Sequence, residues 1–251
     1  MQKARSCSRQ ELDPQESQGD LVFTADPTLS LITDDGNGTD PRRITITSHF
    51  SNANRQVEVR DNRRFIEKYD PTRGILSAEF NTEGTGDNFY DAYRDVYWSG
   101  YARNPNRANA AHGRTDIRSH KGLEAITGVP VISMAVKKPF FHIDTAMTPL
   151  TNGHIIAFED GMRKEAFNNL MGEGFERYGM DPEEYLVKVS AEDAAAYACN
   201  LICIGDTVIM PLVSGQLQDR IKAKEYDVIT LDMSCFIADG GAMHCLTNNI
   251  D

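Results

Sequence analysis

The chain has 251 residues, of which 40% are hydrophobic and 25% are charged, so it is long enough to bury a full hydrophobic core. Its formal net charge of −11 argues against nucleic acid or an anionic membrane as a partner, because binding phosphate groups requires clustered lysine and arginine. No stretch approaches the ~20 consecutive apolar residues of a membrane-spanning helix, so we expect a cytoplasmic enzyme or binding domain.

Composition along the chain predicts a single domain. Residues 1–19 are polar and have no apolar core, so we expect a flexible leader followed by one catalytic or binding domain over residues 20–251. The cysteines form no CxxC pair, which argues against a zinc site or a disulfide framework and indicates reduced thiols. There are five of them: Cys7, Cys199, Cys203, Cys235 and Cys245. We expect no metal and no cofactor.

Short strand patterns dominate the first quarter of the chain. Residues 21–25 form a β-type run that ends at the turn-forming pair Asp26-Pro27. The alternating segments 44–47 and 57–59 predict two further strands. Residues 60–69 then predict an amphipathic helix that stops before Pro71.

The next segments are richer in loops. In residues 79–87, glycines bracket acidic residues, which indicates a loop presenting carboxylates, with a solvated glycine-rich turn as the alternative. Residues 103–112 form an insert that is either part of a lid over a site or a surface loop. A helix over 117–127 and a strand over 129–136 follow.

A histidine and an aspartate share the apolar run 139–146. Strict alternation along a strand would place His142 and Asp144 on one side and Phe141 and Ile143 on the other. A histidine beside aromatic residues is commonly a hydrogen-bonded core residue, so this pair alone leaves a core role and a catalytic role open.

The remaining third alternates strand and helix patterns, which predicts an α/β fold. No GxGxxG motif or P-loop occurs, which argues against nucleotide binding. The predicted elements are a strand at 155–158, a helix at 163–177, a strand at 185–189, a helix at 191–198, two strands within 199–210, a helix at 214–224 and a strand at 228–231.

A cysteine close behind two glycines, Gly240-Gly241-Ala242-Met243-His244-Cys245, makes the last segment a candidate catalytic turn. Glycine allows positive φ or a close approach to a ligand, so Cys245 can face a cavity as a nucleophile. Adjacent residues on an extended strand point to opposite faces, so we expect Cys245 to work with His142 rather than with His244.

Five motifs, in this order over residues 20–250, resemble those of the guanidine-modifying enzymes: arginine deiminases, arginine dihydrolases, dimethylarginine dimethylaminohydrolases and amidinotransferases. They are Phe23-Thr24-Ala25-Asp26-Pro27, Arg55-Gln56-Val57-Glu58, Glu83-Gly84-Thr85-Gly86-Asp87, Phe141-His142-Ile143-Asp144-Thr145 and Gly240-Gly241-Ala242-Met243-His244-Cys245-Leu246-Thr247. The resemblance implies a five-bladed α/β propeller, in which five ββαβ modules with pseudo-fivefold symmetry surround a narrow active site.

By position, the resemblance implies three catalytic residues. Cys245 matches the family nucleophile, His142 the general acid and base, and Glu83 the carboxylate that works with it. We expect the Cys245 thiol to be protonated before substrate binds, because burial raises a thiol pKa and an adjacent cation lowers it.

Four further residues match substrate-binding positions of the family. Asp26 and Asp144 match the two acids that bind the guanidinium nitrogens, for which carboxylates are suited because they accept bidentate hydrogen bonds. Arg55 matches an arginine that binds the substrate α-carboxylate, which would disfavour agmatine. Arg114 matches a second basic residue near the substrate.

The implied activity is hydrolysis of the guanidinium group of arginine or an arginine derivative through a covalent thiouronium intermediate. A deiminase giving a citrulline-like product and ammonia is our first prediction. Arginine dihydrolase and dimethylarginine dimethylaminohydrolase are alternatives, an amidinotransferase is a further one, and a binding protein on the same scaffold is a third class. The sequence does not decide between a monomer and a homo-oligomer.

Two positions depart from the family pattern. The segment Ser234-Cys235-Phe236 has a cysteine where members often carry glutamate. The first motif ends in Ala-Asp-Pro, as in deiminases, whereas the dihydrolases have an asparagine here, which weakens the expectation of two successive hydrolyses.

Overall fold

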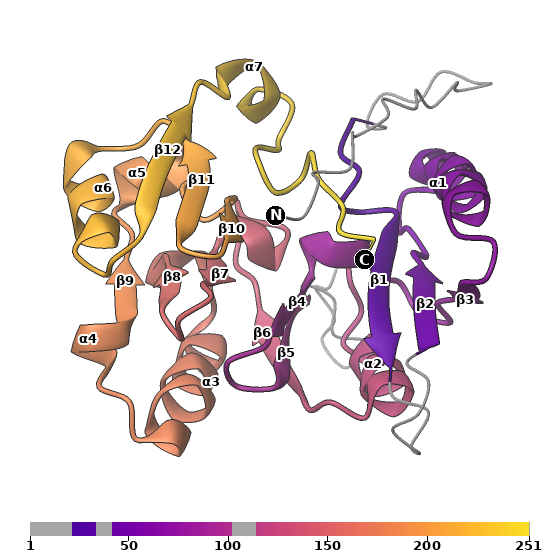
Figure 1. Ribbon diagram of the computed structural model, residues 1–251, viewed down its shortest axis with the longest axis horizontal. Helices are drawn as coiled ribbons and strands as arrows, with labels where there is room; N and C mark the ends of the chain where they lie inside the picture. The colour runs from indigo at the N-terminus through magenta and orange to yellow at the C-terminus, as the bar shows by residue number, and fades with distance from the viewer. Residues whose placement is uncertain (1–21, 34–41, 102–113, 251) are drawn as a thin grey trace, which may run out of the picture.

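The computed structural model describes residues 22–33, 42–101 and 114–250 (Figure 1). The predictions for the leader at 1–19, for the insert at 103–112 and for Cys7 lie outside these residues. Within the described part, no helix combines the length and apolar character needed to cross a bilayer.

Four small mixed sheets of three strands each form the described part of the molecule, which confirms the α/β class. In every sheet the first two strands are antiparallel, and the third pairs in parallel with the second. A helix connects the parallel pair, as such a connection requires. The ββαβ module implied by the resemblance is therefore repeated four times among the described residues, and the strands do not join into one closed sheet.

The modules follow one another along the chain. The first contains β1 (Thr28–Thr33), β2 (Arg42–Thr47), α1 (Gln56–Tyr69) and β3 (Gly74–Ser77). The second contains β4 (Asn88–Asp91), β5 (Val96–Tyr101), α2 (Arg118–Thr127) and β6 (Val131–Ala135).

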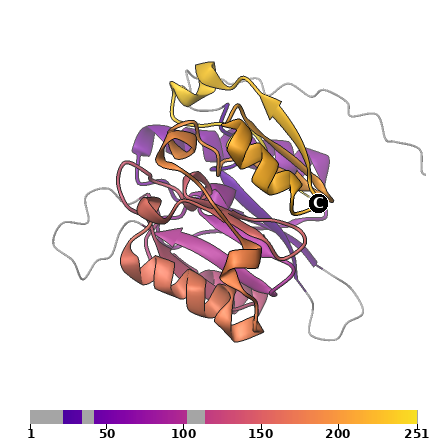
Figure 2. The same ribbon diagram turned by 90° about the vertical axis from the view of Figure 1, so that its left-hand side faces the viewer.

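The third module contains β7 (Met147–Pro149), β8 (Ile155–Ala157), α3 (Lys164–Gly174), α4 (Pro182–Tyr185) and β9 (Leu186–Lys188). The fourth contains α5 (Ala191–Ala195), β10 (Ile202–Ile204), β11 (Thr207–Pro211), α6 (Gly215–Lys222) and β12 (Asp227–Leu231). The connecting helices lie on the outside of the sheets, as α3 and α6 do in Figure 2. A last helix, α7 (Ser234–Ile237), precedes the C-terminal segment.

Most predicted elements of the last two modules are confirmed, but three predictions for residues before β7 are wrong. The predicted strand at 57–59 lies inside α1, where Val59 and Ile66 share a buried helix face. The run at 21–25 precedes its strand, because residues 24–27 form a turn and β1 begins at Thr28. The run at 139–146 contains a 3₁₀ turn, Ile143–Thr145, so strand alternation does not apply to it.

The second and third modules are joined through a buried arginine in the turn after β4. Arg94 contacts Asp91 through Nη1, at 2.8 Å from Oδ2, and donates from Nε to the carbonyl of Gly174 and from Nη2 to that of Gly153. The fully buried Trp98 donates its indole N–H to the same Asp91 oxygen at 3.0 Å. One ion pair therefore satisfies polar groups of two modules inside a hydrophobic core.

The C-terminal segment runs from α7 to β1 (Figure 1). Its backbone accepts a hydrogen bond at the carbonyl of Cys245 from the N–H of Ala25, 3.2 Å away, and Asn248 donates to the hydroxyl of Thr28. Met243 packs in a cluster with Ile202 of the fourth module. The segment thus bridges the first and fourth sheets.

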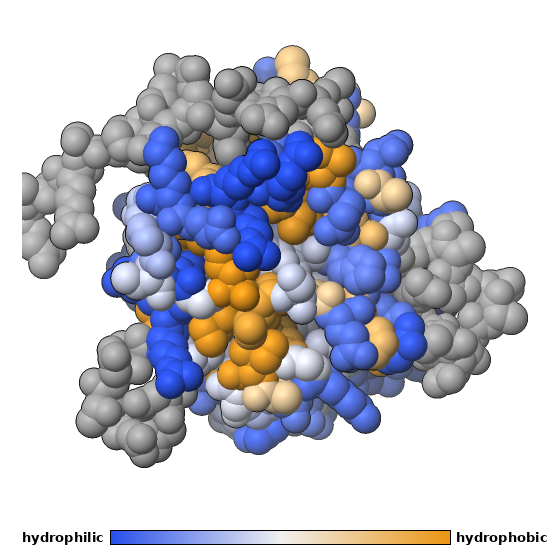
Figure 3. Space-filling view, turned by 90° about the vertical axis from the view of Figure 1, so that its right-hand side faces the viewer, coloured by the Kyte–Doolittle hydropathy of each residue, from blue (hydrophilic) through white to orange (hydrophobic). Residues whose placement is uncertain are grey.

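The face that carries the first module also has a groove of about 810 Å³ between α2 and the neighbouring sheet. Leu29 and Ile46 line it from the sheet, and Leu123 and Ile126 from the helix. Figure 3 shows hydrophobic residues gathered on this face.

We predict that Arg94→Met lowers the free energy of unfolding by about 3–5 kcal/mol, because it leaves Asp91 as an unpaired charge in the core. Arg63→Met is the matched control, since Arg63 pairs with Glu67 on the surface and its loss costs less than about 1 kcal/mol. Urea unfolding monitored by circular dichroism measures both. Equal denaturation midpoints for the two variants would contradict the role given to Arg94.

Candidate active site

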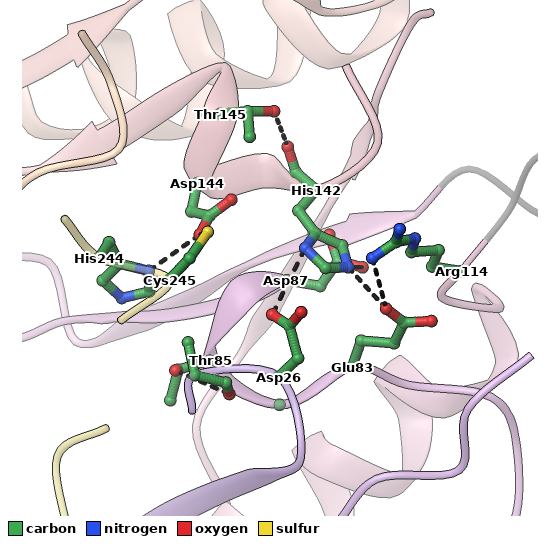
Figure 4. A network of polar contacts seen from close by, with 12 residues as sticks. Asp26, Glu83, Thr85, Asp87, Arg114, His142, Asp144, Thr145, His244 and Cys245 are labelled. Atoms are coloured by element: carbon green, nitrogen blue, oxygen red, sulfur yellow. Dashed lines mark hydrogen bonds and ion pairs between the residues drawn. The ribbon is translucent and has the colours of Figure 1, made fainter. Parts of the chain in front are cut away.

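The segments just before the first strands of the modules converge at the centre of the molecule. Asp26 lies two residues before β1, Asp87 one residue before β4 and Asp144 three residues before β7. Figure 4 shows Asp26 and Asp87 beside the imidazole of His142, and Asp144 beside Cys245 of the C-terminal segment. The first three modules therefore each deliver one acidic residue to the centre.

Cys245 is buried, with 2% of its surface exposed, and has a hydrogen-bonding neighbour on two sides. Its Sγ lies 3.3 Å from Oδ2 of Asp144, to which the thiol donates, and 3.1 Å from Nδ2 of Asn200, which donates to the sulfur. Burial raises the pKa of the thiol well above its usual value, and Asp144 and Asp26 raise it further. The thiol is therefore protonated at neutral pH in the absence of a cation, as expected.

His142 is fully buried among carboxylates. Its Nε2 lies 2.8 Å from Oε2 of Glu83, and its Nδ1 lies 3.5 Å from Oδ1 of Asp26. Burial lowers the pKa of His142, but Asp26, Asp87 and the hydrogen bond with Glu83 raise it by more, to about 9. The imidazole therefore carries a proton at neutral pH and can donate it.

The surroundings of His142 shift the pKa values of the neighbouring carboxyl groups in opposite directions. Burial raises the pKa of Glu83, but its hydrogen bond to His142 and the positive charges nearby lower it by more, so this carboxyl stays ionised. Burial raises the pKa of Asp87 to about 6 and also raises that of Asp26. Glu83 and His142 thus form the tightest ion pair of the site.

Arg55 is a buried cation beside this cluster. Its Nη1 lies 2.9 Å from Oδ2 of Asp26, and its Nε and Nη2 donate to the two carboxylate oxygens of Glu58 at 3.0 and 2.9 Å. These contacts offset the cost of burying its charge and raise its pKa further above the ordinary arginine value. Binding of a substrate carboxylate by Arg55 stays a prediction.

A cavity of about 70 Å³ reaches Cys245 and Asp26 from outside. Arg114 lies at this cavity with about a third of its side chain exposed, over the ring of Phe141 and 3.4 Å from Oε2 of Glu83. Phe23 and Asp239 complete the lining on the other side. The cavity is therefore small, and the partly exposed Arg114 belongs to its lining.

Two glycines are required by the packing of the site. Gly84 has φ +50°, and a Cβ at this position would overlap the backbone carbonyls of the Asp26 turn. A Cβ on Gly86 would lie 2.5 Å from Oδ1 of Asp26 and 2.9 Å from Nδ1 of His142. The loop at 79–87 presents carboxylates, as predicted, because these glycines allow it to pack against the turn.

Asp26, Glu83 and His142 each offer an atom within 4.8 Å of the others, which is the spacing of a metal site. Arg55 and Arg114 already neutralise the two carboxylates of this trio. A further divalent cation would meet their guanidinium groups, so this donor set favours an organic cation at its edge over a bound metal.

The structure corrects the placement of His244. Residues 243–246 form a turn rather than an extended strand, and Nδ1 of His244 lies 3.0 Å from Oδ2 of Asp144. The same carboxylate oxygen accepts the thiol hydrogen of Cys245. His244 and His142 thus contact different carboxylates, on opposite sides of the cavity that Cys245 faces (Figure 4).

Sequence reasoning missed Asn200. This residue lies two residues before β10, at the position that Asp26 holds before β1, and its amide contacts Cys245. No local sequence pattern marks it, because the equivalence of the short polar residues just before the first strands depends on where those strands begin in the structure.

No model of a known protein family matches the chain. A bifunctional arginine dihydrolase/ornithine cyclodeaminase of Synechocystis sp., ArgZ, is 26% identical over 248 residues, which are 98% of this chain and 31% of that protein. An N(G),N(G)-dimethylarginine dimethylaminohydrolase of Mycobacterium tuberculosis is 29% identical over 146 residues, 57% of this chain and 45% of that one. The chain thus spans about a third of the first relative and about half of the second.

Among solved structures, the N-terminal domain of ArgZ bound to its product superimposes with a TM-score of 0.79 at 23% identity. The match covers 95% of this chain and 78% of that domain. At this level of identity the likeness establishes the fold of the described residues.

We predict that the two buried histidines titrate on opposite sides of neutrality. His120 has its pKa lowered to about 4, chiefly by burial, whereas His142 among its carboxylates has a pKa of about 9. Titration of ¹³C-labelled histidine by NMR measures both. Glu83→Gln should lower the pKa of His142 and leave that of His120 unchanged; two signals that both titrate near the ordinary histidine pKa would contradict this assignment.

Proposed function

Because the chain belongs to the guanidine-modifying superfamily, we propose that it is a cysteine-dependent hydrolase of the guanidinium group of arginine or an arginine derivative. Its relatives named above include an arginine dihydrolase and a dimethylarginine dimethylaminohydrolase. The chain spans about a third of the first of these.

One observation supports the proposal above all. Oδ1 of Asp144 is a buried acceptor without a hydrogen-bond partner among the described residues, and Oδ1 of Asp26 has only the longer ion-pair contact of 3.5 Å with Nδ1 of His142. Both carboxyl groups act on Cys245. A buried carboxylate oxygen without a donor is costly, so the site is complete only with a ligand that donates. A guanidinium ion is planar and carries N–H donors on two sides, which fits two facing carboxylates.

The first half of the reaction uses the proton on His142. The bound guanidinium lowers the pKa of the Cys245 thiol, which ionises, and the thiolate attacks the central carbon to form an S–C bond. The imidazolium of His142 then gives its proton to one guanidinium nitrogen, the C–N bond breaks, and ammonia leaves. The enzyme is left as a thiouronium adduct with His142 neutral.

The second half returns the enzyme to its starting state. Neutral His142 accepts a proton from water, whose oxygen attacks the thiouronium carbon. The hydroxyl proton of this adduct then passes to the sulfur as the C–S bond breaks, which releases the neutral ureido product and restores the Cys245 thiol. Glu83 keeps the imidazole oriented through both steps, because its contact to Nε2 holds one ring nitrogen in place.

For the substrate, we favour arginine in a single hydrolysis that gives citrulline. Asp26 lies where dihydrolases carry asparagine, and its carboxylate is held by Arg55 at 2.9 Å, so it remains available as an acceptor for the second guanidinium nitrogen. Arg114, partly exposed at the cavity, is better placed than the buried Arg55 to meet the α-carboxylate.

We also propose that the four described sheets are four modules of the five-bladed propeller that the resemblance implies. The C-terminal segment supports this, because it contacts the first module at Ala25 and the fourth at Asn200. It therefore occupies the gap between them.

Product analysis tests the proposed activity. Incubation with arginine, methylated arginines and agmatine, followed by mass spectrometry, should give citrulline and ammonia from arginine. Cys245→Ser should bind arginine without turnover. Ornithine as the product would indicate a dihydrolase, and transfer to an added amine would indicate an amidinotransferase. Absence of turnover of every guanidine would refute the enzyme proposal.

Arg114→Met tests how the substrate is oriented. We expect the KM for arginine to rise by about tenfold or more, because a hydrogen-bonded charge pair with the α-carboxylate is lost. Agmatine has no carboxylate, so its KM should change little. Steady-state kinetics with the two substrates measures the difference, and an equal rise for both would assign the carboxylate contact elsewhere.

A further inference from the structure

The side chain of Asn200 is fully buried and is fixed on Cys245 at two points. Its Oδ1 accepts the backbone N–H of Cys245 at 3.2 Å, and its Nδ2 donates to Sγ at 3.1 Å. Because the first contact orients the amide, the second aims an N–H donor at the sulfur atom itself. The amide thus contacts the atom that reacts.

The other neighbours of the sulfur suit a thiol and oppose a thiolate. The thiol donates to Oδ2 of Asp144 at 3.3 Å, and the charge of Asp26 also acts on it. After ionisation the sulfur has no hydrogen to donate, and the carboxylate repels it. The amide of Asn200 still donates to the sulfur in that state.

The position of Asn200 in the repeated module explains why an amide stands there. Asp26, two residues before β1, is the equivalent residue of the first module. A carboxylate at position 200 would place a further negative charge 3.1 Å from the sulfur. Asparagine has the same shape as aspartate but supplies a donor, so it favours the ionised sulfur instead.

We propose that Asn200 is a catalytic residue that holds the Cys245 thiolate through its Nδ2 donor. The proposal rests on the function of Cys245 as the nucleophile. When the thiol loses its proton to water, the hydrogen bond from Asn200 shortens onto the negative sulfur. No bond to Asn200 forms or breaks, and the amide returns unchanged.

Alkylation of the free enzyme by iodoacetamide tests this without turnover. Rates at Cys245 are followed by peptide mass spectrometry at a series of pH values in Asn200→Asp and Asn200→Leu. Aspartate keeps the acceptor for the backbone N–H, and leucine adds no charge. We expect alkylation of Cys245 to slow by about tenfold or more in both variants, with its pH profile moved to higher pH, because a hydrogen bond to a charged group is lost.

If Asn200 had only a structural role, its replacement should raise the alkylation rate of Cys245 instead of lowering it. If Asn200 only packs the site, its loss loosens the segment around a buried thiol, and Cys245 would react faster. The fully buried Cys199 reports unfolding, and the exposed Cys235 reports the reactivity of the reagent in the same molecule. Faster alkylation of Cys245, alone or together with Cys199, overturns the proposal, as does an unchanged rate.

The matched control is Asn169→Asp, the same chemical change at an exposed asparagine of α3. It should leave the alkylation rate at Cys245 unchanged.

Turnover of guanidines distinguishes failure of the role given to Asn200 from failure of the proposed activity. Slower alkylation in the Asn200 variants with no guanidine hydrolysis by the wild type would leave the role of Asn200 intact and refute the proposed activity. Turnover by the wild type, with an alkylation rate that does not change in the Asn200 variants, would support the proposed activity and refute the role of Asn200.

Discussion

The centre of the molecule depends on holding several carboxyl groups together away from water. Asp26, Glu83 and Asp144 are each at most 3% exposed, and burying acidic groups side by side is costly without cations in place. The buried Arg55 and the protonated His142 supply those cations. Both cations contact specific oxygens, and one carboxyl oxygen each of Asp26 and Asp144 accepts no hydrogen bond among the described residues.

The need to bring these buried acidic groups together also explains the arrangement of the modules. A ββαβ module places the residues before its first strand at the centre and its helix outside, and four modules repeat this arrangement. The acid or amide at each inner position comes from a different part of the chain, so each one can vary without altering the packing of the helices. The same position, just before the first strand, recurs in every described module. Only the type of short side chain at that position differs.

The sequence predicted the parts of this arrangement that local patterns encode. The α/β class, the helix of the second module and the strands of the fourth follow from periodicity and glycine turns. The strand at 57–59 was wrong because β-branched Val57 and Val59 favour a strand locally, whereas burial of Val59 and Ile66 on one face favours a helix. The convergence of His142 and Glu83, 59 residues apart, required the resemblance, since no local pattern specifies contacts at that separation. Asn200 was missed because its role follows from the equivalence of positions between modules, which is visible only in three dimensions.

The contacts that complete the site also join the most distant parts of the chain. Asn248 reaches Thr28 across 220 residues, and Cys245 meets Asp144 across 101. Closing such long loops costs entropy that short-range contacts within a module do not. The modules can therefore assemble before the C-terminal segment settles between the first and the fourth. Partial unfolding of that segment alone would separate Cys245 from the acids around it while the sheets persist, so the assembled site and the overall secondary structure have different thresholds of heat and denaturant.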